Sequence, residues 1–241
     1  MRVLAIDTAL EACSVAVLDT AQDAILARET RPMVRGHAEA LMPFVASVMT
    51  QSFLRFSDLD RVAVTVGPGS FTGLRVGLAA ARGIGLALRR PVVGLTTLAA
   101  LAAPYLEEDD GPPVASAIDA RHQHVYLQLF APGALKKSIA AGLAHDLAKD
   151  VAMSRPQIVP LHEAVQATAG VVGRIVGSGA RLIADAWPEN MRNPLIIERR
   201  AAEIDWVARL GASVEETMAT PKPLYLRAVD ARPFTGQLAR R

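Results

Sequence analysis

The chain carries one short pattern twice: an apolar strand that ends in an aspartate, then a brief turn and a second strand. The first copy reads LAID and then SVAVL, with its aspartate at Asp7. The second reads SAID and then HVYLQLF, with its aspartate at Asp119. Each copy has the form of a hairpin. Two hairpins with an aspartate in the same place predict two related lobes with a cleft between them.

The elements around the first hairpin predict a mixed sheet flanked by helices. Three closely spaced strands begin the chain, which indicates an antiparallel meander. Apolar residues then recur at intervals of three and four over 37–54, which predicts a helix, and a second helix is expected over 72–88. The resulting order, βββαβαβ, is typical of an α/β sheet covered by helices. The predicted strands are 3–6, 14–18, 24–28, 62–66 and 91–95.

A turn-rich acidic stretch, PYLEEDDGPP at 104–113, predicts the connection between the lobes. We therefore expect residues 1–103 to form the first lobe and residues 104–200 to form the second.

The remaining elements are sparser. We predict a helix at 161–169, a strand at 171–176 and a helix at 201–210 that is free to pack back on the first lobe. The stretch 131–160 predicts no definite element. Residues 212–241 are expected to form a solvated tail that contains Arg227, Arg232, Arg240 and Arg241.

Composition favours a globular cytoplasmic protein. Of the 241 residues, 51% are hydrophobic and 21% are charged, and the formal net charge of +2 is too small to make nucleic acid the default partner. The longest apolar run, 76–88, is interrupted by Arg82 and is shorter than the roughly 20 residues of a membrane span. The single cysteine, Cys13, excludes an internal disulfide, fits a reducing compartment and is expected to be a core thiol.

The stretch VTVGPGSFTGLRVGLAAARGIGLAL, residues 64–88, invites comparison with a phosphate-binding loop. A P-loop needs GxxxxGK[ST], but Thr72 stands five residues after Gly67 and the stretch has no lysine. The dinucleotide pattern GxGxxG fails as well, because Thr72 also replaces its third glycine after Gly67 and Gly69. Only a weak anion site at the helix start near Ser70 and Thr72 is left.

Small residues recur every fourth position in this helix, at Gly73, Gly77, Ala81 and Gly85. They form one stripe along the helix. Each interior glycine costs about 1 kcal/mol relative to alanine, so the three glycines together forfeit roughly 3 kcal/mol. Close approach of another element would offset this loss. The sequence leaves open, with equal weight, whether that element is the chain's own sheet or a helix of another subunit.

Catalytic and metal-binding patterns are weak. His37 and Glu39 lie near one helix start, but Leu41 occupies the position where a second ligand would be needed, which favours a surface or interface histidine. His122 and His124 would share one strand face without further ligands. There is no recognisable acid and base pair and no GxSxG elbow. We therefore predict no catalytic residue, no metal and no cofactor.

Two glycines of VGSGA, Gly177 and Gly179, follow a predicted strand and precede a helical pattern. Together with the aspartate hairpins and the internal echo, they predict the actin-like ATPase and sugar-kinase architecture, a two-lobed α/β fold with mixed sheets flanked by helices. Resemblance to that architecture implies nucleotide-type loops, here degenerate. The candidate residues are Asp7, Thr8, Gly67, Gly69, Gly177 and Gly179.

Six stretches together resemble the TsaB family, also called YeaZ. They are LAIDTALEACSVAVLD, HAEALMPFV, the 64–88 segment, PVVGLTTLAAL, DARHQHVY and KPLYLRA. The resemblance implies a noncatalytic partner of TsaD in the complex that places threonylcarbamoyl on adenosine 37 of tRNAs that read ANN codons. TsaD is similar in fold and carries a metal-binding HxxxH. Here Thr97 and Leu101 stand in the corresponding places, and they cannot replace two imidazole ligands.

The resemblance also implies that the two helices of the first lobe form the subunit interface, with a homodimer able to use the same surface. A TsaE-like ATPase is expected in the same complex, and direct contact with tRNA is left open. Replacing Gly77 with leucine would then block association without unfolding the monomer. The expected interface residues are His37, Leu41, Phe44, Val48, Gly73, Leu74, Gly77, Ala81 and Gly85.

The rival hypothesis is an enzyme, either an ATP-dependent sugar-kinase-like phosphotransferase or a metal-dependent glycoprotease. A kinase would bind ATP tightly and release phosphate on turnover. A protease of this type would carry stoichiometric zinc or iron.

Overall fold

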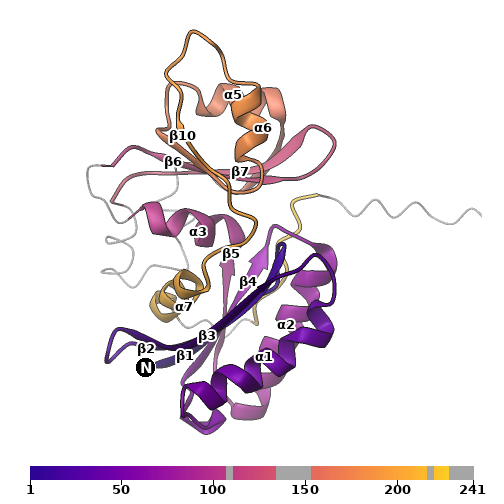
Figure 1. Cartoon of the computed structure of the whole chain (residues 1–241), viewed down its shortest axis with the longest axis vertical. Coiled ribbons are helices and arrows are strands. Elements are labelled where there is room, and N and C mark those ends of the chain that lie inside the picture. Colours follow the sequence, from indigo (N-terminus) through magenta and orange to yellow (C-terminus); the bar gives the residue numbers. More distant parts are fainter. Residues whose placement is uncertain (107–110, 134–152, 216–219, 228–241) are drawn as a thin grey trace, which may run out of the picture.

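The computed structural model describes residues 1–106, 111–133, 153–215 and 220–227, which form two stacked lobes (Figure 1). Each lobe is built on a five-stranded mixed sheet. The first sheet has the order β3-β2-β1-β4-β5 and the second the order β10-β9-β6-β7-β8. The first-lobe strands are β1 (Arg2–Asp7), β2 (Ala12–Asp19), β3 (Ala24–Pro32), β4 (Arg61–Gly67) and β5 (Val92–Thr96).

All five strands predicted in the first lobe are confirmed, and so is the antiparallel meander. β1 pairs with β2 and β2 with β3 in antiparallel register, whereas β4 lies parallel to β1 and β5 parallel to β4. Parallel pairing needs a crossover, and α2 (Phe71–Leu88) supplies the one between β4 and β5. β3 continues to Pro32, four residues beyond its predicted end at Arg28.

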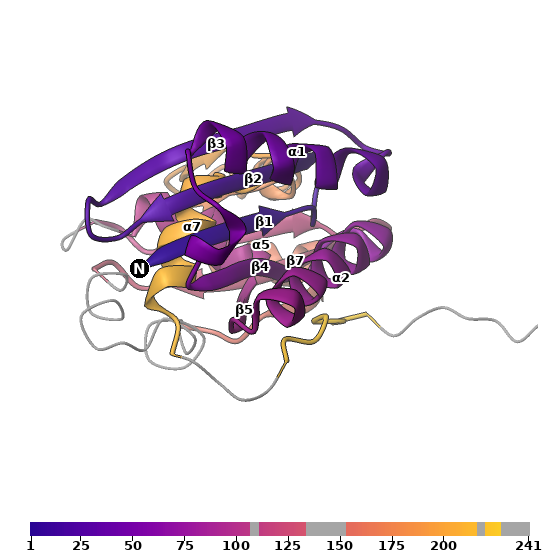
Figure 2. The same ribbon diagram turned by 90° about the horizontal axis from the view of Figure 1, so that it is seen from below.

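Helices cover both faces of the first sheet (Figure 2). Side chains alternate along a strand, so Leu4 and Ile6 of β1 face one core and Val3 and Ala5 face the other. The first core contains the buried sides of α1 (His37–Gln51) and α2. The second contains α3 (Thr97–Ala102) and α7 (Ile204–Ser213).

The second lobe repeats the hairpin of the first. β6 (Val114–Asp119) and β7 (His124–Phe130) pair antiparallel, and β9 (Arg174–Val176) lies parallel to β6. The sheet is completed by β8 (Gln157–Pro160) and β10 (Leu195–Ile197). The outer face is covered by α5 (Leu161–Thr168) and α6 (Ala180–Asp185), and the inner face packs on α3.

The two predicted helices of the first lobe are confirmed, but α1 ends at Gln51 instead of Leu54. The hydroxyl of Ser52 donates to the Met49 carbonyl at 2.8 Å, and Phe53 has a positive φ of 56°. A residue in this left-handed conformation ends a helix.

Element boundaries in the second half differ for local reasons. The predicted strand 171–176 begins only at Arg174, because the amides of Val171 and Val172 still donate to Thr168 in the last turn of α5. The predicted helix 201–210 begins at Ile204, since the Arg200 carbonyl accepts from the Glu11 amide at 3.0 Å. The sequence did not predict α3, β8 or β10. Part of the unassigned stretch 131–160 lies outside the described residues.

Arg61 joins α7 to the first sheet. This residue of β4 is 5% exposed, and its guanidinium donates to three carbonyls at the end of α7, those of Gly211, Ala212 and Val214, at 2.9, 3.1 and 2.6 Å. A cation at this end of a helix also interacts favourably with the helix dipole. Gly211 itself lies against Ala63 of β4, where a Cβ atom would collide. The last helix is therefore packed on the first sheet.

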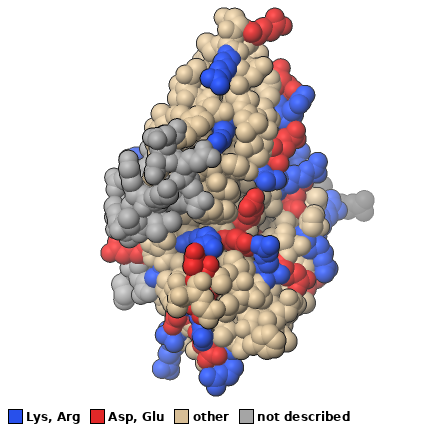
Figure 3. All heavy atoms as spheres, turned by 60° about the vertical axis from the view of Figure 1, so that its left-hand side comes forward, with Lys and Arg blue, Asp and Glu red and all other residues tan. Residues whose placement is uncertain are grey.

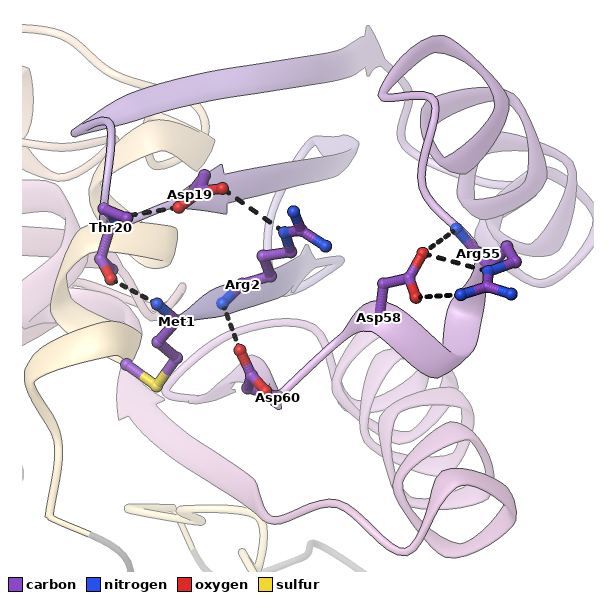
Figure 4. A network of polar contacts seen from close by, with 8 residues as sticks. Met1, Arg2, Asp19, Thr20, Arg55, Asp58 and Asp60 are labelled. Atoms are coloured by element: carbon purple, nitrogen blue, oxygen red, sulfur yellow. Dashed lines mark hydrogen bonds and ion pairs between the residues drawn. The ribbon is translucent and has the colours of Figure 1, made fainter.

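A polar network fixes the amino-terminal end of β1 (Figure 4). The Arg2 amide donates to Asp60 at 2.8 Å, and its side chain reaches Asp19 at 3.4 Å. The amino group of Met1 donates to the Thr20 hydroxyl at 2.8 Å. This end of the sheet is therefore tied to the turns before β3 and before β4.

Among the described residues, α2 is the one helix long and apolar enough to cross a membrane by length and composition. A core helix of a globular protein passes the same test. One side of α2 lies buried on β1 and β4, and its apolar character on that side is explained by packing.

Candidate partner interface and interlobe cleft

Asp7 ends β1 in a fully enclosed position. Its side chain is 1% exposed, and its Oδ1 accepts hydrogen bonds from the Thr65 hydroxyl at 2.6 Å and the Ala9 amide at 2.9 Å. Burial raises the pKa of Asp7, and these two hydrogen bonds offset part of that rise. The carboxylate is therefore engaged in holding its own turn.

The turn after Asp7 packs directly on the start of α2. The Thr8 hydroxyl donates to the Gly73 carbonyl at 2.7 Å, and the Ser70 amide donates to the Ala9 carbonyl at 2.7 Å. The Gly73 amide donates to the Ser70 hydroxyl at 3.3 Å, which caps the helix. The Thr8 hydroxyl and the amides of Ser70 and Gly73, which could otherwise donate to a phosphate, thus donate to groups of the chain itself.

Gly67 and Gly69 lie in the loop between β4 and α2. Gly67 has a φ of 116°, a conformation that glycine adopts readily. A Cβ atom at Gly69 would collide with the Ala9 carbonyl. Both glycines therefore serve the contact of this loop with the first hairpin and with neighbouring backbone.

The second hairpin is closed in a comparable way. Gly177 has a φ of 119°, and its amide donates to the Ile197 carbonyl at 3.0 Å. The Gly179 amide donates to the Ala117 carbonyl at 3.0 Å, and the Asp119 amide donates to the Ser178 hydroxyl at 3.2 Å. The structure thus brings both sets of candidate loops to the cleft between the lobes, and the amides of Ala9, Ser70, Gly177 and Gly179 donate within the chain.

A cavity of about 520 Å³ lies in this interlobe cleft. Its arginines are balanced by carboxylates, since Arg200 pairs with Glu11 at 3.3 Å and Arg121 lies 4.0 Å from Asp119. Acidic and basic side chains are also interspersed on the face shown in Figure 3. The described cleft therefore lacks the excess of positive charge that a triphosphate would favour.

The residues at the place of a metal site do not fit a metal. Thr97 and Leu101 lie on α3 and are 0% and 1% exposed, packed in the core between the two sheets. The described residues contain no group of three or more His, Cys, Asp or Glu side chains able to hold an ion. A hydroxyl and an isobutyl group offer no equivalent of two imidazoles.

The histidines and the cysteine are placed differently from some expectations. His37 is 7% exposed with its Nε2 3.2 Å from the Leu10 carbonyl, so the predicted surface or interface histidine is wrong. His122 lies in the turn before β7 with a φ of 51° and does not share a strand face with His124. Cys13 is buried as predicted, and burial raises the pKa of its thiol to about 11.

The nine residues expected at the subunit interface are buried inside the monomer, which corrects that prediction. A Cβ at Gly73 or Gly77 would collide with Thr8, and one at Gly85 would collide with Val92. The glycine stripe therefore serves the chain's own sheet and first hairpin. Replacing Gly77 with leucine would disrupt the monomer itself. The nine residues are His37, Leu41, Phe44, Val48, Gly73, Leu74, Gly77, Ala81 and Gly85.

The opposite faces of α1 and α2 are exposed and carry large apolar side chains. Met42 is 49% exposed on α1, and Phe71 and Leu86 are 44% and 83% exposed on α2. Gly83 is exposed, and a Cβ atom added there would meet no neighbouring group within 4 Å. Exposed apolar side chains that share a helix face are one feature of surfaces that contact another protein. We call this exposed face of the two helices the outer helix face.

Comparisons with known proteins agree on one family. The family model for TsaD, tRNA N6-adenosine threonylcarbamoyltransferase, matches residues 25–224. The tRNA threonylcarbamoyladenosine biosynthesis protein TsaB of Escherichia coli is 34% identical over 189 residues, covering 78% of this chain and 74% of that protein. TsaB of Haemophilus influenzae is 35% identical over 126 residues, which is 52% of each chain.

Solved structures agree with the sequence matches. An uncharacterized protein from Pseudomonas aeruginosa with similarity to peptidase YeaZ has a TM-score of 0.75 at 28% identity, covering 94% of this chain and 99% of that one. YeaZ from the same organism has a TM-score of 0.72 at 27% identity, covering 93% and 99%.

Two stacked mixed sheets, each begun by a strand–aspartate hairpin, define the two-lobed fold of actin-like ATPases and sugar kinases, as predicted. Within that class, the chain belongs to the TsaB, or YeaZ, family, and the TsaD family model covers it as well.

Substitutions of the α2 glycines test whether the glycine stripe packs on the first hairpin and sheet of the same chain. We expect Gly77→Ala to lower the free energy of unfolding by about 1–3 kcal/mol, because the added methyl group meets Thr8. Gly83→Ala is the matched control in open space and should leave stability unchanged or raise it by about 0.5–1 kcal/mol. Urea unfolding of both variants measures the difference. Equal effects of the two substitutions would contradict the packing.

Asp7 predicts a pH-dependent difference in stability. A carboxyl whose folded pKa is raised binds protons more readily in the folded state, so its stabilising contribution is lost as pH rises from about 3.9 through the folded pKa. Asp7→Asn has no titrating carboxyl and therefore no such loss of stability, and its side-chain oxygen can still accept the hydrogen bonds from Thr65 and Ala9. The stability of Asp7→Asn relative to the unmodified protein should therefore increase with pH in that window. Urea unfolding between about pH 4 and 8 measures it, and a pH-independent difference would argue against the buried carboxylate.

Proposed function

We propose that this chain is a noncatalytic subunit of the tRNA threonylcarbamoyladenosine pathway that binds and activates a TsaD-like subunit. The partner transfers threonylcarbamoyl to N6 of adenosine 37 in tRNAs that read ANN codons. Membership of the TsaB family supports this assignment, because its relatives carry the name of that pathway. A cytoplasmic location follows from the proposed role in tRNA modification.

The closed state of the nucleotide-type loops is the observation that carries the proposal. The amides of Ala9, Ser70, Gly73, Gly177 and Gly179 all donate within the chain. A phosphate would have to displace several of these bonds, each with a net value of about 0.5–1.5 kcal/mol. The two imidazoles that the resemblance implies for the metal site of TsaD are replaced here by Thr97 and Leu101. The chemistry is therefore assigned to other subunits, including an ATPase similar to TsaE.

The outer helix face is the proposed docking surface for the TsaD-like subunit. Small residues, Ala79 and Gly83, lie on the same exposed side of α2 as Leu86. Small side chains let a second helix approach closely, and large apolar ones beside them exclude water from the contact. A second copy of this chain could occupy the same face when the partner is absent.

The test of this proposal uses a bulky residue on the outer helix face. Gly83→Trp should leave the monomer folded, because a side chain there enters open space, and should abolish co-purification with the TsaD-like subunit. Glu163→Trp, on exposed α5 of the second lobe, is the matched control and should co-purify normally. Undiminished co-purification of Gly83→Trp would rule out this face as the docking site.

A further inference from the structure

The chain returns to the first lobe after α7. Residues 220–227, which we call the C-terminal segment, run beside α2 in both views (Figures 1 and 2). The Leu224 amide donates to the Val66 carbonyl at 2.8 Å, and the Arg82 guanidinium donates to the Pro221 carbonyl. Arg227 reaches the second lobe and donates to the Ala120 carbonyl at 2.9 Å. The C-terminal segment is thus fixed to α2, to the end of β4 and to the second hairpin.

This segment completes a cluster of three side chains at the start of α2. The Arg75 guanidinium lies 3.6 Å from the centre of the Phe71 ring, and its Nε donates to the Tyr225 hydroxyl at 3.2 Å. The Phe71 and Tyr225 rings are 5.6 Å apart. Stacking and a hydrogen bond together hold the guanidinium in one orientation. We call Phe71, Arg75 and Tyr225 the arginine cluster.

The arginine cluster faces solvent with its charge unbalanced. Phe71 and Tyr225 are 44% and 43% exposed, and Arg75 is exposed as well. Within the described part of the chain, Arg75 forms no ion pair with a carboxylate. The sequence of α2 contains no acidic residue. The other charged side chains of α2 and of the described C-terminal segment, Arg82, Lys222 and Arg227, are all basic.

The terminal nitrogens of the Arg75 guanidinium have the geometry to bind a carboxylate. Its Nε is taken by Tyr225, which leaves the two terminal nitrogens as a planar pair of donors. Such a pair binds the two oxygens of a carboxylate at once. Because the guanidinium is already held by Phe71 and Tyr225, little conformational entropy is lost on binding. Arginine and tyrosine are also enriched among residues that dominate binding energy at protein interfaces.

We propose that the arginine cluster binds a carboxylate side chain of the protein that docks on the outer helix face. This inference rests on the proposed function, since Phe71 belongs to the outer helix face, Arg75 follows it one turn later on α2, and the C-terminal segment lies beside both. Exposed apolar side chains further along the same helix, such as Leu86, favour a protein over RNA, as does the modest net charge of +2. The partner is therefore expected to present an acidic residue opposite the first turns of α2.

Titration calorimetry of the full chain against the TsaD homologue of the same cell tests this inference. Arg75→Ala should weaken binding by at least about tenfold, or about 1.4 kcal/mol. Tyr225→Phe keeps the ring and loses only the hydroxyl contact, and should weaken binding by about two- to threefold. Arg90→Ala removes the same charge just beyond α2 and is the matched control, with a change below about twofold. Circular dichroism of each variant checks that the fold is kept.

Three outcomes would overturn the inference, and they can be told apart. If Arg75→Ala behaves like Arg90→Ala, the cluster is not a binding site, while the proposed function stands. If Arg75→Ala lowers the affinity for tRNA in a gel-shift assay but leaves binding to the TsaD homologue unchanged, the ligand is RNA. If the unmodified chain does not bind the TsaD homologue at all, the proposed function fails, and the carboxylate site fails with it.

Discussion

The structure depends on the close contact between the first hairpin turn and the start of α2. Glycines at 73 and 77 bring the helix so near to Thr8 that the Thr8 hydroxyl donates to the Gly73 carbonyl at 2.7 Å. This contact fixes the direction of α2, which in turn carries the chain from β4 to β5 and sets α1 beside it. Glycine in a helix is costly, and here the cost is offset by packing within one chain.

The same contact engages several backbone groups of the nucleotide-type loops that border the interlobe cavity. Backbone groups that could point into the cleft bond to each other across the two loops, and Asp7 is sealed beneath them. What the fold leaves exposed is the far side of the two helices, where Leu86 and Met42 meet solvent. We therefore place the proposed partner contact on this surface and not in the interlobe cleft.

Much of the first lobe was predictable because its signals are local. Strand alternation, the helical spacing and the repeated strand–aspartate hairpin each act over a few residues, and the structure agrees with them. The stripe of small residues is visible in the sequence, but the element that packs on it is not. Gly77 lies against Thr8, some seventy positions earlier in the chain. The cluster with Tyr225 was missed for the same reason. Contacts between distant segments arise from tertiary packing, and local sequence periodicity does not reveal which segments will meet.

Hydrogen exchange of the full chain, measured with and without the TsaD homologue, locates the surface that the partner covers. We expect added protection on binding to be concentrated in peptides from α1, from α2 and from residues 220–227, while peptides that line the interlobe cleft around Gly69 and Gly177 stay unchanged. Protection confined to the cleft peptides, or none anywhere, would contradict it.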